Sequence, residues 1–109
     1  MATLTAQAIG LAGINPTYAS AASGGDKVSP GDRSFVHVKN GGGSPVTVTL
    51  TATASVRGQA VGNITVSVPA SGERMIGPLT SDLLAGPTDG FVAVGYSSNT
   101  SVTIASLRI

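Results

Sequence analysis

Residues 34–53, SFVHVKNGGGSPVTVTLTAT, contain two segments in which apolar and polar side chains alternate, joined by the only glycine triplet in the chain. In residues 35–39 both valines fall on one face, and residues 46–53 alternate valine, leucine or alanine with threonine. This period of two predicts strands with one buried face, and β-branched residues favour strands. The connection, residues 40–45, accepts positive φ, and Pro45 opens the second segment where a missing N–H does least harm. The stretch therefore predicts a β-hairpin.

The rest of the chain repeats this pattern of short segments between glycine- and proline-rich turns. Further strands are expected at 17–22, 63–68, 73–76, 91–96 and 101–107, and the last two are expected to form a hairpin about Ser98 and Asn99. Residues 56–61 are interpreted as an exposed, mobile loop, and residues 80–84 as one helical turn. Short strands at regular spacing indicate an all-β fold, a single β-sandwich or barrel-like domain over residues 1–109.

The N-terminal segment, residues 1–15, is predicted to form a short helix or arm in front of a β-sandwich at 16–109. Thr3 or Thr5 would cap the helix, and Gly13 would end it. Two roles stay open for this segment. It either plugs one end of the sheets or acts as an arm that packs on a neighbouring subunit.

The composition limits the size of the core. Hydrophobic residues make up 41% of the chain, but aromatic residues only 4%. The core is therefore expected to consist of small aliphatic side chains, with four large members: Tyr18, Phe35, Phe91 and Tyr96. Because burial contributes about 25 cal/mol per Å², such a core is thin, and oligomerisation or docking on a partner is expected to add stability.

The charge content excludes several classes of protein. Charged residues make up 10% of the chain, and the formal net charge is +1. A nucleic-acid binder needs a basic patch, which this composition does not supply. A surface so poor in charge is better suited to being covered by partners. The chain has no cysteine, which excludes disulfides, thiolate metal sites and thiol catalysis. No segment approaches the length of a membrane span, and the apolar run at 2–14 has no basic residue before it, so no secretory signal is expected.

The residues that carry chemistry do not form a recognisable catalytic pattern. His37 is the only histidine and lies mid-strand. The chain has no Gly-x-Ser-x-Gly motif to supply a nucleophilic serine for it, so a structural or surface role is expected. Three acidic residues stand beside a basic one and are interpreted as solvated charge pairs or turn formers: Asp26, Asp32 and Glu73. The glycine triplet lacks the continuation of a phosphate-binding loop. We therefore expect no enzyme, no catalytic or metal-binding residues, and no cofactor.

A row of threonines in the second half of the opening stretch is a candidate contact surface. Long edge strands normally carry lysine or a bulge as protection against pairing, and this flat, uncharged row carries neither. It is either a solvated face or a contact with a partner or symmetry mate. The candidate interface residues combine the N-terminal segment with this row: Leu4, Ile9, Leu11, Ile14, Thr47, Thr49 and Thr51.

Several short motifs, in their order along the chain, resemble those of a known group of proteins. They are Asn15-Pro16-Thr17-Tyr18, Gly24-Gly25-Asp26-Lys27, FVHVKNG at 35–41, Val66-Ser67-Val68-Pro69-Ala70, RMIGP at 74–78, Val94-Gly95-Tyr96-Ser97 and Val102-Thr103-Ile104-Ala105. The chain resembles the small head decoration or minor capsid proteins of tailed bacteriophages, of the type found in phages of actinobacteria. It departs from their pattern between Val56 and Val61. The resemblance implies an all-β virion protein on the capsid exterior.

The predicted function follows from this resemblance together with the residues. A decoration (cement) protein would bind the outside of the major capsid protein lattice and stabilise the head, as a homo-oligomer such as a trimer at three-fold positions. It would need neither nucleic acid nor a membrane. Residues 2–14 would be the anchoring arm, and removing the first fourteen residues would abolish capsid association but leave the sandwich folded. The alternatives are an immunoglobulin-like or carbohydrate-binding module on a virion or cell surface, and a tail or head–tail joining protein.

Overall fold

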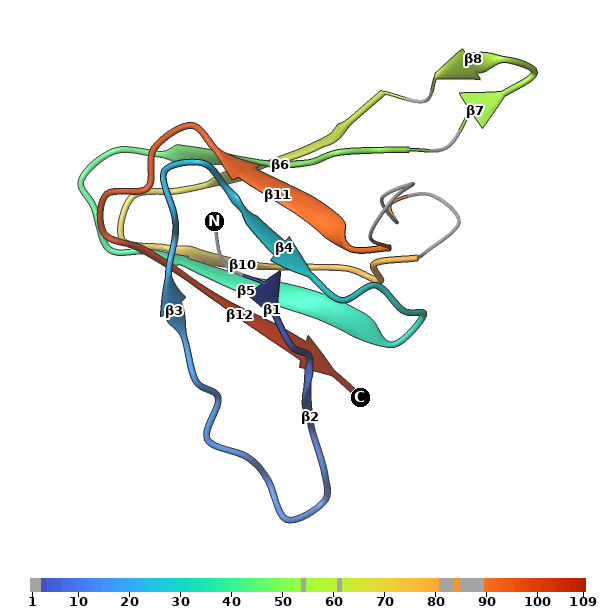
Figure 1. Ribbon diagram of the computed structural model, residues 1–109. Coiled ribbons are helices and arrows are strands. Elements are labelled where there is room, and N and C mark those ends of the chain that lie inside the picture. The colour runs from blue at the N-terminus through green and yellow to red at the C-terminus, as the bar shows by residue number, and fades with distance from the viewer. Residues whose placement is uncertain (1–2, 54, 61, 81–83, 85–89) are drawn as a thin grey trace.

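Two β-sheets pack face to face in the computed structural model, which describes residues 3–53, 55–60, 62–80, 84 and 90–109 (Figure 1). Sheet A contains, in spatial order, β1 (Thr3–Leu4), β4 (Asp26–Val28), β11 (Val92–Tyr96), β6 (Val46–Leu50) and β9 (Ile64–Val68). Sheet B contains β10 (Glu73–Ile76), β5 (Ser34–Asn40), β12 (Val102–Arg108) and β2 (Gln7–Ala8), and β3 (Ala19–Ser20) also pairs with β12. The prediction of an all-β sandwich is confirmed.

The core lies between the sheets and is built from the alternating residues. Val36 and Val38 of β5 face Val48 and Leu50 of β6 across the core, and all four are at most 1% exposed. The four aromatic residues are not the large members of this core, as the composition suggested. Each is only half-buried, and Tyr96 alone among them packs against the core cluster. Leucine, isoleucine and valine therefore supply the buried surface.

The predicted hairpins are wrong, although their strands are correct. β5 belongs to sheet B and β6 to sheet A, so residues 41–45 carry the chain across the core from one sheet to the other. The same is true of β11 and β12, and β5 pairs instead with β12 and β10. Alternation tells which side chains are buried but not which strand supplies the hydrogen bonds. Two consecutive strands bury the same faces whether they pair or face each other.

Asn40 fastens the crossing loops at one end of the sandwich. It is 2% exposed, its Nδ2 donates to the carbonyl of Ser44 at 2.8 Å, and its Oδ1 accepts from the N–H of Gly42 at 2.9 Å. Nδ2 also lies 3.3 Å from the carbonyls of Val68, the last residue of β9, and of Pro69 in the loop that leads to β10. Contrary to the prediction, none of the three triplet glycines has positive φ. A Cβ on Gly42 would lie 3.2 Å from Asn40 Oδ1, so close approach is the reason for glycine there.

The N-terminal segment is not a helix. β1 pairs in parallel with β4 at the edge of sheet A, and β2 pairs in parallel with β12 in sheet B. These short strands form hydrogen bonds with backbone groups at the two sheet edges that would otherwise be unpaired. The helix propensity of this segment is weak and is lowered further by Gly10, so pairing with the sheets is favoured over a helix. Residues 3–8 are therefore part of the sandwich and cannot serve as a detached arm.

The segment expected as a loop at 56–61 contains a small ribbon. β7 (Ser55–Val56) and β8 (Gln59–Ala60) pair antiparallel at the far end of β6 and β9 (Figure 1). Arg57 and Gly58 have φ of 52° and 82°, as a two-residue hairpin turn requires. Of the helical turn predicted at 80–84, residues 81–83 lie outside the described part of the chain, and the N–H of Leu84 donates to the carbonyl of Thr80 at 3.0 Å.

Candidate interaction site

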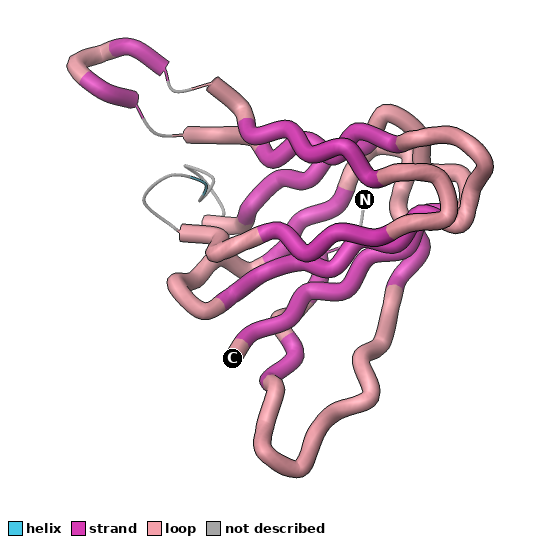
Figure 2. The backbone as a smooth tube through the Cα atoms, turned by 180° about the vertical axis from the view of Figure 1, so that it is seen from behind, coloured by secondary structure: helices cyan, strands magenta, loops and turns pink. Residues whose placement is uncertain are grey.

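A loop of residues 9–16, called here the projecting loop, extends from the edge of sheet B away from both sheets (Figures 1 and 2). Leu11 is fully exposed, with an exposed fraction of 109%, and Ile9 and Ile14 are 40% and 39% exposed. The first charged residue of the chain is Asp26, so nothing in this loop is charged. Three of the predicted interface residues therefore lie together on one apolar projection. The fourth N-terminal candidate, Leu4, packs against the core instead.

The base of the projecting loop is closed by one side chain. The Gln7 carboxamide donates from Nε2 to the carbonyl of Thr17 and accepts the Thr17 N–H on Oε1, both at 2.9 Å. The two hydrogen bonds replace those that a paired backbone residue would make, and they join the two ends of the loop. Within the loop, the N–H of Gly13, at φ 78°, donates to the carbonyl of Gly10 at 3.0 Å. These bonds restrain the loop at its base and at one internal turn, and restraint of this kind lowers the entropy lost on binding.

A row of polar side chains on the outer face of sheet B supports the same base. The Tyr18 hydroxyl lies 2.7 Å from His37 Nδ1, and the two rings meet edge to face with centroids 5.6 Å apart. Lys39 Nζ lies 4.2 Å from the centroid of the Tyr18 ring, a cation–π contact. His37 Nε2 lies 3.3 Å from Glu73 Oε1, without the geometry of a hydrogen bond. His37 is thus 6% exposed and held between Tyr18 and Glu73.

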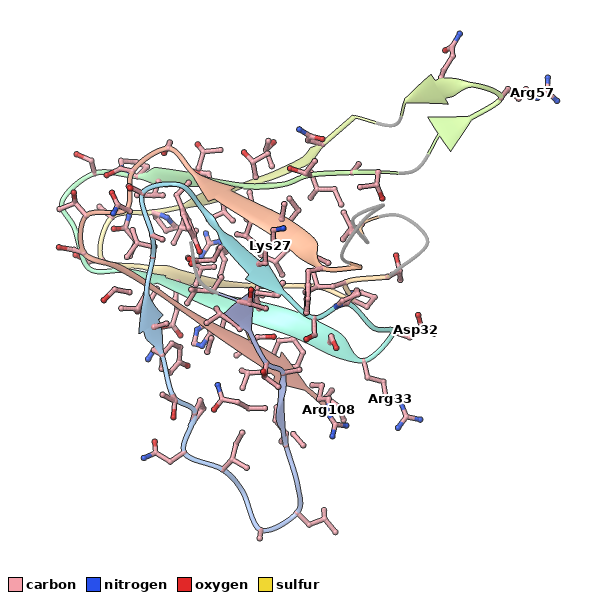
Figure 3. All side chains as sticks on the ribbon, viewed as in Figure 1. Lys27, Asp32, Arg33, Arg57 and Arg108 are labelled. Carbon is pink, nitrogen blue, oxygen red and sulfur yellow. The ribbon has the colours of Figure 1, made fainter. Side chains whose placement is uncertain are left out.

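An apolar groove of about 410 Å³ lies near the other edge of sheet B. We call it the sheet B groove, and its lining is Asp32, Arg33, Ser34, Phe35, Met75, Ile76, Gly77, Pro78 and Ile109. Met75 is 65% exposed and Ile109 69% exposed. The labelled side chains of Asp32 and Arg33 extend outward from the turn before β5 (Figure 3). The sequence did not reveal this groove, because its residues come from three separate parts of the chain.

The predicted threonine row lies on the outer face of sheet A. Thr47 and Thr51 are exposed and Thr49 is half-buried. Across the strands Thr47 pairs with Ser67 and Thr49 with Thr65, so the row widens into a face of hydroxyl side chains. β6 is not the expected edge strand, because it lies between β11 and β9. We call this surface the threonine face.

The aspartate of one predicted charge pair, Asp26 beside Lys27, is buried instead of solvated, whereas Lys27 is half-buried. Asp26 is 1% exposed, and its Oδ2 accepts hydrogen bonds from the Tyr96 hydroxyl at 2.7 Å and the Ala22 N–H at 3.3 Å. Burial, followed by the hydrogen bond and charge of Asp26, raises the pKa of Tyr96 well above its ordinary value. The interacting residues are 70 positions apart, so no local pattern could indicate the contact.

In the described residues, no three histidine, cysteine, aspartate or glutamate side chains gather as they would around a metal ion. No helix in that same part of the chain has the length and apolar character needed to cross a membrane. Comparison with models of protein families, with curated proteins and with solved structures finds no match for this chain. The projecting loop, the sheet B groove and the threonine face are the candidate interaction surfaces of the described residues.

Proposed function

We propose that this protein is a structural protein of a phage virion, a decoration protein that coats the outside of the major capsid lattice in many copies as a homo-oligomer. The observation that carries the proposal is the projecting loop. A preformed, charge-free loop with Leu11 fully exposed is costly to keep in water and becomes favourable once a protein surface covers it.

The energy available from one loop explains why many copies are needed. A leucine or isoleucine side chain that becomes fully buried contributes about 1.5–3 kcal/mol. Association costs about 4–15 kcal/mol in lost translational and rotational freedom. One loop therefore binds weakly by itself. Copies arranged on a regular shell bind together, and their combined affinity far exceeds that of one site.

The threonine face is the second contact surface in this proposal. It is broad, lies over regular strands, and presents Thr47, Thr49 and Thr51 without a charged side chain among them. The threonines can lie against another protein without leaving a charge buried and unpaired, and Lys27, a cation on the same side of sheet A, lies two strands away beside Ala93. Contact through the face and through the loop together gives the coat its strength.

The aromatic side chains support this function over binding of carbohydrate. Sugar-binding modules usually offer an open aromatic ring. Tyr18 has Lys39 over its ring and its hydroxyl against His37, and Tyr96 is hydrogen-bonded to the buried Asp26. Both tyrosines are therefore engaged by other side chains of the protein.

The test is binding to undecorated heads of the phage that carries this chain. Purified protein should bind in a saturable way, with a copy number that matches the repeated positions of the capsid lattice, and Leu11→Asp should lower occupancy. The matched control is Gln59→Asp, an exposed position on the distant ribbon, which should bind normally. No binding would contradict the proposal. A copy number equal to a single ring at one vertex would assign the protein to the head–tail junction instead.

A further inference from the structure

Five large hydrophobic side chains stay exposed among the residues that the structure describes, and all of them belong to two features. Ile9, Leu11 and Ile14 are on the projecting loop, and Met75 and Ile109 line the sheet B groove. We propose that the groove of one copy receives the projecting loop of the next copy. This inference rests on the proposed function and names the surface that covers the loop.

The two features fit in shape and size. The loop is convex and presents Leu11 between the two isoleucines, and the groove is hollow, with Phe35 and Ile76 beside the exposed Met75. A cavity of about 150 Å³ holds a molecule the size of benzene. At about 410 Å³ the groove has room for the Leu11 side chain and one neighbouring isoleucine.

The charges also suit a second copy better than a charged partner. The loop carries no charge, and the groove has one acidic and one basic residue, Asp32 and Arg33, beside an apolar lining. An acidic or basic ligand would gain little from this balanced pair. An uncharged apolar loop gains from the lining and leaves both charges in water.

The positions of the two features make the contact head to tail. The strand order of sheet B puts β2, where the loop begins, at one edge and β10, which supplies Met75 to the groove, at the other. The groove extends toward the base of the loop at Ile109, because the Ile9 N–H donates to the carbonyl of Arg108 at 2.8 Å. The loop points away from the sheets (Figures 1 and 2), so it does not reach the groove of its own copy. A contact between different surfaces of identical chains closes into a ring or continues as a chain. A ring of copies would suit a symmetric position on a capsid.

The test uses the absence of cysteine from the chain. Leu11→Cys and Met75→Cys variants are mixed under a mild oxidant, first in solution and then on undecorated heads. Both positions are exposed, so neither change should affect folding, which thermal unfolding verifies. We expect a disulfide-linked heterodimer at a yield about tenfold above that of the control mixture, Leu11→Cys with Gln59→Cys, because docking raises the effective concentration of the two thiols.

The outcomes separate this inference from the proposed function. Equal cross-linking in the two mixtures, both in solution and on heads that the variants coat, would overturn the inference and leave the decoration function standing. Specific cross-linking of Leu11→Cys to Met75→Cys by a protein that binds no heads would support the inference and overturn the function. A non-covalent check is Met75→Lys, which should lower self-association as much as Leu11→Asp, whereas Gln59→Lys should not.

Discussion

Asn40 and Tyr96 are the side chains on which two buried hydrogen-bonding sites depend. Asn40 joins the loop after β5 to the loop before β10, and Tyr96 satisfies the carboxylate of Asp26 at the same end of the sandwich. In each site the central polar side chain, Asn40 or Asp26, is at most 2% exposed. Removing one partner therefore leaves the other with no replacement, and this makes single substitutions here more damaging than their size suggests.

Asn40→Ala should lower the free energy of unfolding by about 1–3 kcal/mol, because the buried carbonyl of Val68 and the partly buried groups of Ser44 and Gly42 lose their partner. Urea denaturation measures this change. Asn15→Ala, on the exposed projecting loop, is the control and should shift stability by less than about 0.5 kcal/mol. A similar small change for Asn40→Ala would mean that the crossing loops hold together without it.

Tyr96 should make the protein sensitive to alkaline pH. Its pKa is raised in the folded state, so above the unfolded value of about 10 the unfolded chain loses the phenolic proton while the folded chain keeps it. The unfolding free energy should then fall as the pH rises above about 10, by less than the limit of about 1.4 kcal/mol per pH unit because Tyr96 is partly exposed, and the contribution of this group is fully present below about pH 10. Urea denaturation from pH 9 to 11 should show a shallower fall in Tyr96→Phe. Parallel curves for the two proteins would argue against a neutral Tyr96 held by Asp26.

At the scale of elements, the N-terminal strands and the projecting loop have different tasks although they are adjacent in sequence. β1 and β2 complete the edges of the two sheets, and the residues after them leave the body as a loop closed by Gln7 and Thr17. β1 and β2 stabilise the sandwich, and the projecting loop is the part proposed to contact other proteins. A truncation removes both together, whereas substitutions in the loop separate them.

Deleting residues 1–14 should therefore lower the unfolding temperature and promote aggregation, since it exposes the edges of β4 and β12. Changing Ile9, Leu11 and Ile14 to serine should leave the unfolding temperature nearly unchanged, because all three side chains are at the surface. Differential scanning calorimetry and light scattering compare the two variants. An unchanged unfolding temperature in the truncated protein would show that β1 and β2 add little to the sandwich.

At the scale of the whole molecule, low charge and exposed apolar groups decide how copies meet. The net charge is +1, the projecting loop is uncharged, and the threonine face presents hydroxyl groups. Long-range attraction is therefore weak, and contact depends on the burial of apolar surface. Salt affects these two forces in different ways, and this offers a test.

Coating of heads should change less than about threefold in apparent affinity between low and high sodium chloride, since there is little charge to screen. Sulfate at the same ionic strength should strengthen it, because this ion favours burial of apolar surface. Sedimentation of heads with bound protein measures both effects. A strong loss of binding in sodium chloride would show that charged side chains dominate the contact.

Local patterns were sufficient to predict β3, β5, β6, β9, β10, β11 and β12 with their buried faces, and to mark the apolar residues at 9, 11 and 14 as interface candidates, which prove to be exposed. They missed β1, β2, β4, β7 and β8. Both signals depend on neighbours in sequence, because alternation has a period of two residues and the loop has no strand pattern to bury it. The sheet B groove, by contrast, forms only where Phe35, Met75 and Ile109 come together. The Tyr18–His37 and Asp26–Tyr96 contacts likewise join segments that are distant in sequence. The tertiary structure alone decided these, along with the crossing of β5 to β6 and the two N-terminal strands. The physical reason is that strand pairing satisfies backbone hydrogen bonds between distant segments, and those bonds are nearly independent of which side chains the segments carry.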